Sequence, residues 1–249
     1  MRPCQIFLLT LKVEYKKGLL NMASYIPRLW QFLREVGANN NRPWFMAHKE
    51  EYDELRRLWF ADLDRLVAAM AEWEPELRGL SGRSVAYRIY RDIRFSPDKS
   101  PYKTYFSASI SRYGRKAHMP GYYLHMGPHE MTGLYGGMWM PDSQMLRKLR
   151  NAIVDNIEEF TGIISEPEFL RFYPEWFGES LKTVPKGWPK DHPNADLLRL
   201  KEYGRWTPLD EHFFASNPDW PQIVADRFRL LKPLNDFLSY SLEEEIFTL

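Results

Sequence analysis

The chain has little cysteine: Cys4 is the only one among 249 residues. A single thiol excludes an internal disulfide framework and a metal site built from several cysteines, and it favours a reducing compartment. No apolar run is long enough to span a bilayer. The apolar residues 6–11 are too few for a signal-peptide core, and no small-residue cleavage site follows them. We therefore expect a cytoplasmic protein that is not inserted in a membrane.

Net charge is also low, at +1, but the charges are unevenly distributed. Residues 83–118 contain nine basic and two acidic side chains, whereas residues 119–249 carry a net charge of −7. A basic island in an acidic remainder favours the local binding of an anion. It does not favour general adhesion to nucleic acid, which needs a basic surface of larger extent.

The spacing of apolar residues predicts helices followed by strands. Three- and four-residue spacing predicts helices over residues 24–37 and 43–73. Alternation of apolar and polar side chains then predicts strands over residues 85–93, 104–111, 121–127 and 132–140. Helical spacing returns after Pro141, one more strand is expected at 202–209, and Pro233 is expected to break or kink the last helix. Strands that follow one another directly predict an α+β fold, with a central antiparallel sheet on which helices from both ends of the chain pack.

The sequence predicts a single domain preceded by an extension. Met22 is followed by Ala23 and Ser24 and reads as an alternative start. We therefore expect residues 1–22 to be an extension that is disordered or not native. Residues 24–249 contain neither an internal repeat nor a low-complexity linker, so we expect them to form one α+β domain.

The most informative stretch is RIYRDIRFSPDKSPYK, at residues 88–103. If it begins as a strand, alternate side chains share a face, and Ile89, Arg91, Ile93 and Phe95 point the same way. A guanidinium on this apolar face needs a fixed partner, because removing one member of a buried ion pair costs about 3–5 kcal/mol. We therefore predict that the three apolar residues belong to the core and that Arg91 forms a structural ion pair.

The remaining cations of this stretch are candidates for binding an anion. Arginine can hold a phosphate or carboxylate with two parallel hydrogen bonds, while lysine acts as a point charge. The following strands add aromatic side chains that can stack on a base or a sugar. The candidate ligand-binding residues are Arg88, Arg94, Lys99, Tyr102, Lys103, Tyr123, His125 and Trp139. A solvated hairpin with surface ion pairs, and simple cross-strand packing of the aromatic rings, remain open as alternatives.

Other motifs give weaker signals. The histidines within residues 118–129 match no familiar metal motif, so no metal and no cofactor is expected. The glycines of residues 133–137 fit neither a dinucleotide nor a nucleoside-triphosphate fingerprint; they indicate a bulge or a close backbone approach. Asp191 and His192 could form an acid–base pair, but Pro193 indicates that they begin a helix.

Several blocks of the chain resemble one family, in the same order. These blocks are NNNRPWFMAHKEEY, RIYRDIRFSPDKSPYKTYFSASI, PGYYLHM, GGMWMP and PKGWPKDHPNADLLRLKEY. Together they resemble the uncharacterised bacterial family known as domain of unknown function 2461. The resemblance covers about residue 24 to the C-terminus and leaves out residues 1–22. It implies a single domain, and it implies no catalytic residue, because no activity is established for the family.

Three hypotheses for function follow. The leading one is a domain that binds a small phosphorylated or carboxylated compound at a basic site lined by aromatic rings. The second is an enzyme that acts on such an anion, with His125 or His192 as the acid or base. The third is a structural or interaction protein that meets its partner through an aromatic surface.

Overall fold

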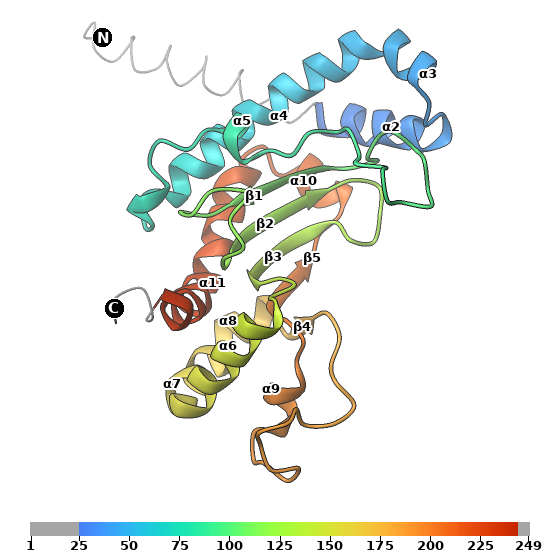
Figure 1. Cartoon of the computed structure of the whole chain (residues 1–249). Helices are drawn as coiled ribbons and strands as arrows, with labels where there is room; N and C mark the ends of the chain where they lie inside the picture. Colours follow the sequence, from blue (N-terminus) through green and yellow to red (C-terminus); the bar gives the residue numbers. More distant parts are fainter. Residues whose placement is uncertain (1–24, 244–249) are drawn as a thin grey trace, which may run out of the picture. The chain divides into compact units, whose positions relative to one another are not determined.

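The computed structural model describes residues 25–243. The expected extension at residues 1–22 lies outside the described residues. The fold is α+β, as predicted, with a five-stranded antiparallel sheet (Figure 1). The helices are α2 (Tyr25–Ala38), α3 (Arg42–Ala47), α4 (Lys49–Met70), the 3-10 helix η1 (Pro75–Leu77), α5 (Gly82–Val85), α6 (Ser143–Asp155), α7 (Ile157–Ser165), α8 (Pro167–Phe172), α9 (Ala195–Arg199), α10 (Glu211–Ser216) and α11 (Trp220–Glu243). Among these helices, none combines the length and the apolar character needed to cross a bilayer.

The strands follow the order β1-β2-β3-β5-β4 across the sheet. They are β1 (Phe106–Ile110), β2 (Gly121–Met126), β3 (Gly133–Met138), β4 (Glu175–Phe177) and β5 (Tyr203–Pro208). Four of the five predicted strands are confirmed by β1, β2, β3 and β5. Strand β4 was not predicted, because its three residues are too few to show alternation; Trp176 of β4 pairs with Arg205 of β5.

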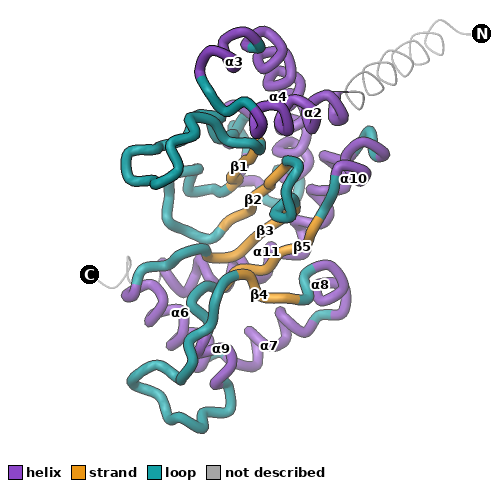
Figure 2. The backbone as a smooth tube through the Cα atoms, turned by 90° about the vertical axis from the view of Figure 1, so that its right-hand side faces the viewer, coloured by secondary structure: helices purple, strands orange, loops and turns teal. Residues whose placement is uncertain are grey.

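The predicted strand at residues 85–93 is wrong. Figure 2 shows the chain between α5 and β1 as loop. Its bridge residues are isolated ones, Ala86, Tyr90 and Tyr102. Ile89 is buried as expected, but Phe95 is 93% exposed. The alternation fails because Pro97 and Pro101 turn the chain here, and proline cannot donate a ladder hydrogen bond.

The described residues divide into two compact units. The first contains residues 25–108, 125–132 and 208–225, and the second contains residues 109–124, 133–207 and 226–243. Strands β1 and β2 and helix α11 each run from one unit into the other. The expectation of a single domain stays a prediction.

A buried carboxylate joins three helices of the first unit. Asp62 of α4 is 1% exposed. It accepts hydrogen bonds from the Tyr25 hydroxyl of α2 and from the Trp220 indole of α11, both at 3.1 Å. Arg65 completes the group with an ion pair of 2.9 Å. Burial raises the pKa of Asp62, and the three donors oppose that rise. The network therefore links helices that are distant in sequence.

We expect Asp62→Ala to lower the free energy of unfolding by about 3 kcal/mol, because it leaves two buried donors, the Tyr25 hydroxyl and the Trp220 indole, without their acceptor. The matched control is Asp219→Ala. Asp219 also pairs with Arg65, but its side chain is 57% exposed, so its loss should cost about 0–1 kcal/mol. Urea unfolding of both variants measures the difference, and equal losses would contradict the assignment.

In the second unit, α11 lies along one face of β2 and β3 (Figure 1). Tyr122 packs on Phe228, with ring centroids 5.3 Å apart. A Cβ on Gly136 would lie 2.6 Å from Leu231 of α11. The predicted close approach at these glycines is therefore confirmed. Of the predicted break or kink at Pro233, the break is wrong, because α11 continues through this residue to Glu243.

Gly137 is the glycine of β3 whose replacement should cost most. Its φ is +113°, and a Cβ there would overlap the carbonyl oxygen of Tyr203 in the paired strand β5. We expect Gly137→Ala to destabilise the protein by about 3 kcal/mol, from backbone strain and from forced strand separation. The control is Gly114→Ala, where φ is +82° but nothing lies within 4 Å; its cost should be about 1 kcal/mol. Thermal unfolding of the two variants compares them.

Candidate functional site

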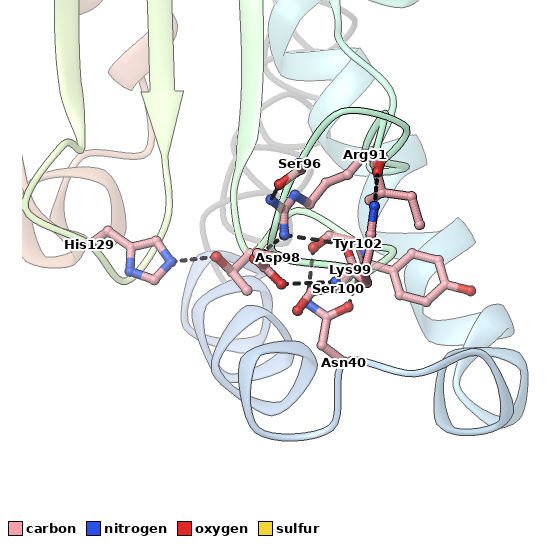
Figure 3. Close-up of polar contacts among 10 residues, drawn as sticks. Asn40, Arg91, Ser96, Asp98, Lys99, Ser100, Tyr102 and His129 are labelled. Atoms are coloured by element: carbon pink, nitrogen blue, oxygen red, sulfur yellow. Dashed lines mark hydrogen bonds and ion pairs between the residues drawn. The ribbon is translucent and has the colours of Figure 1, made fainter.

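The basic segment, residues 88–103, is closed by polar contacts of its own (Figure 3). Arg91 forms an ion pair with Asp98 and also donates to the Ser100 carbonyl at 3.2 Å and the Ser96 hydroxyl at 3.4 Å. Asp98 accepts from the Ser100 amide at 2.9 Å. Hydrogen bonds from Ser100, and then the Arg91 charge, hold the pKa of Asp98 well below its usual range. The guanidinium of Arg91 is thus engaged by side chains and backbone of its own segment.

Tyr102 anchors the basic segment to the turn between α2 and α3. The Asn40 side chain donates to the Tyr102 carbonyl at 2.9 Å and accepts from the Tyr102 amide at 3.0 Å (Figure 3). The Tyr102 ring stacks on Phe45, with centroids 3.9 Å apart and an interplanar angle of 15°. The backbone of Tyr102 also bridges to Tyr90. Tyr102 is therefore a buried anchor, although the sequence suggested it as a ligand contact.

Two of the candidate cations are engaged within the basic segment itself. Arg94 donates to both oxygens of Asp92, at 2.9 and 2.7 Å, and its side chain is 75% exposed. Hydrogen bonds from Arg94, with a smaller contribution from the charge of Arg88, lower the pKa of Asp92 to about 2. Lys99 donates to the carbonyl oxygen of Ile93 at 3.0 Å. Arg88 itself is exposed. Much of the positive charge of this segment is therefore balanced locally.

Lys103 belongs to a second group, which we call the lysine–histidine cluster. Its members, all in the first unit, are Tyr87, Lys103, Thr104, Tyr105, His125 and His129. The Lys103 ammonium lies 5.0 Å from the Tyr87 ring centroid and 5.6 Å from that of Tyr105. Tyr105 stacks on His125 at 4.1 Å. The Thr104 hydroxyl meets the His129 imidazole at 2.6 Å (Figure 3). Two predicted candidates, Lys103 and His125, therefore lie in one group.

The surroundings of His125 in this cluster lower the pKa of its imidazole. Burial, the His129 imidazole and the Lys103 ammonium together lower the pKa of His125 from 6.5 to about 4. His125 is therefore neutral near pH 7. A pKa this low does not suit a general acid or base at neutral pH. Its largest cause is burial, and the charge of Lys103 contributes less.

The lowered pKa of His125 makes the free energy of unfolding depend on pH. Below pH 6.5 the unfolded chain binds a proton at His125, whereas the folded imidazole stays neutral until about pH 4. The stability contributed above pH 6.5 is therefore lost as the pH falls towards 4, by about 2 kcal/mol at pH 5. We expect His125→Gln to remove this component when unfolding is measured at pH 5 and 7. A variant with the wild-type pH profile would contradict the assignment.

The other two candidates, Tyr123 and Trp139, belong to the second unit. Tyr123 is half-buried and meets the ring of Tyr135 edge-on at 5.8 Å. Tyr135 continues the row by stacking on Trp206 at 5.6 Å. Trp139 follows the end of β3 and is exposed. The contacts of Tyr123 are thus those of cross-strand aromatic packing.

Two cavities lie outside all the predicted residues. One, of about 800 Å³ in the second unit, is bordered by Glu159, Ile163, Glu166, Phe169, Asp226 and Arg229. The other, of about 520 Å³ in the first unit, is bordered by Arg56, Arg57 and Arg83. Sequence reasoning missed these arginines because charged side chains on an amphipathic helix are expected to face water. The only available signal was the adjacent Arg56-Arg57 pair.

Metal binding and acid–base chemistry at His192 were also considered from the sequence. Within residues 25–243, no group of three histidine, cysteine, aspartate or glutamate side chains is arranged to hold a metal ion. His192 accepts a hydrogen bond at Nδ1 from the Asn194 amide at 3.0 Å. This contact shapes the turn before α9. His192 belongs to the second unit and His125 to the first.

Comparison with known proteins identifies the family. Neither the curated proteins nor the solved structures include a match to the chain. The sequence model of a family described as a conserved hypothetical protein matches residues 28–237. That range contains the basic segment, the lysine–histidine cluster and the arginine-lined cavity. The chain therefore belongs to the DUF2461 family of conserved hypothetical proteins.

Proposed function

We propose that the protein binds a small phosphorylated or carboxylated compound at the lysine–histidine cluster. The observation that supports this is the grouping of Lys103 with Tyr105 and His125 in one unit. The ligand would be a metabolite of the cytoplasm, the compartment that the single cysteine favours.

The Lys103 ammonium lies over two tyrosine rings, Tyr87 and Tyr105. Such contacts hold a cation weakly, by about 0.5–1 kcal/mol at exposed sites. A hydrogen bond to an ionised partner contributes about 1.5–3 kcal/mol. An anion bound beside Lys103 would therefore gain a charge-assisted hydrogen bond from the ammonium, which lies between the two rings.

His125 lies near this cation and stays neutral mainly because it is buried, with smaller contributions from His129 and Lys103. The positive charge of Lys103 favours an anion nearby. Arg88, Arg94 and Lys99 carry additional positive charge along the same segment, and exposed charges of this kind speed the approach of an anion more than they tighten its binding.

The test is titration with pyrophosphate, adenosine monophosphate, a sugar phosphate and citrate, followed by calorimetry and thermal shift. We expect at least one of them to bind, and Lys103→Met to weaken that binding at least about tenfold, the equivalent of one charge-assisted hydrogen bond. Lys99→Met is the matched control from the same segment, because Lys99 already donates to the Ile93 carbonyl. It should change affinity by less than about threefold.

Two results would contradict the proposal. One is that no anion of the panel binds the wild-type protein at millimolar concentration. The other is binding that survives Lys103→Met and is lost in Lys99→Met or Arg94→Met. The latter result would place the anion on the exposed part of the basic segment.

A further inference from the structure

The arginine-lined cavity has no part in the function proposed above. It lies in the first unit, between α4 and α5, and encloses about 520 Å³, a volume in the range of small-molecule sites. Its charged and aromatic border is formed by Asp53, Arg56, Arg57, Phe60, Asp64 and Arg83. Cations and carboxylates thus face one small space.

The two carboxylates of the cavity already have partners. Asp53 pairs with Arg56 at 3.0 Å and also with Lys49. Asp64 accepts a hydrogen bond from the Gly82 amide at 2.6 Å. By contrast, within residues 25–243, Arg57 and Arg83 have neither an ion pair nor a side-chain hydrogen bond. Their two guanidinium groups are therefore available to an anion.

A close helix contact fixes Arg83 beside α4. A Cβ on Gly82 would overlap the Phe60 carbonyl oxygen and lie 2.9 Å from the Leu63 Cβ, so α5 can approach this closely only with glycine at position 82. Ser81 caps the short helix by accepting from the Ser84 amide at 3.2 Å. Arg83 therefore projects from a rigid turn, which limits the entropy lost when it binds a ligand.

We propose that this cavity binds a sugar phosphate or another phosphorylated polyol, with Arg57 and Arg83 on the phosphate. A guanidinium presents paired donors that match phosphate oxygens, and two of them balance a dianion. Asp53 and Asp64 each have acceptor capacity beyond their present bonds, since a carboxylate has about four acceptor positions. Hydroxyl groups supply the donors that such acceptors need, so the mixed border fits a phosphate attached to a polyol.

The test is calorimetry on the full chain with glucose 6-phosphate, ribose 5-phosphate and glycerol 3-phosphate. Glucose and inorganic phosphate are the matched controls. Glucose tests the contribution of the hydroxyl groups alone, and inorganic phosphate tests that of the phosphate alone. We expect at least one phosphorylated polyol to bind at least tenfold more tightly than inorganic phosphate, and glucose to bind no more tightly than inorganic phosphate. Arg57→Met and Arg83→Met should each lower that affinity at least tenfold.

Two controls keep the result specific. Arg78→Met removes an exposed arginine outside the cavity and should change affinity by less than twofold. Arg147→Met removes an exposed arginine of the second unit and should likewise change affinity by less than twofold. Thermal unfolding checks that each variant folds. The proposal is overturned if none of the three compounds binds, or if binding persists in both Arg57→Met and Arg83→Met.

Discussion

The basic segment is anchored by a pair of hydrogen bonds between the Asn40 side chain and the backbone of Tyr102. The Asn40 amide bonds both the N–H and the C=O of Tyr102, as a neighbouring β-strand would do. Because the Tyr102 ring also stacks on Phe45, the segment is fixed to the first unit by polar and apolar contacts together. Lys103 follows directly, so its position beside Tyr87 and Tyr105 depends on this anchor.

Local balance of charge is the second determinant of the site. The sequence presents a run of cations, but Asp98 engages Arg91 and Asp92 engages Arg94. These exposed or half-exposed pairs contribute little to stability; their effect is to give the loop a defined shape. The effective positive charge is therefore smaller than the count of basic residues suggests. Lys103 lies over two aromatic rings, and it is the cation that we propose for contact with a ligand.

Sequence reasoning succeeded where the pattern reflected a packed element. The alternation in β2 and β3 comes from a sheet face covered by α11, where Tyr122 meets Phe228, so those strands were predictable. The same alternation at Ile89 and Phe95 came from a loop, where no neighbouring strand imposes it.

The candidate site was predictable only in part. Lys103 and His125 were found because charge and aromatic rings in a strand region are unusual. Arg57 and Arg83 were missed because their proximity follows from the contact of α5 with α4, and charge on a helix surface carries no local signal. Spacing along the chain does not predict that Lys103 and His125 lie in one group. It also does not predict that Tyr123 belongs to another unit.

The most direct test of the account is the pKa of the His125 imidazole, measured by nuclear magnetic resonance with and without saturating sulfate, which stays dianionic across the titration. Sodium chloride at equal ionic strength is the reference. The account predicts a pKa of about 4 without sulfate and a rise of about one to three units with it, because a nearby anion favours the imidazolium. An unchanged pKa, with sulfate bound elsewhere or not at all, would contradict an anion site at the lysine–histidine cluster.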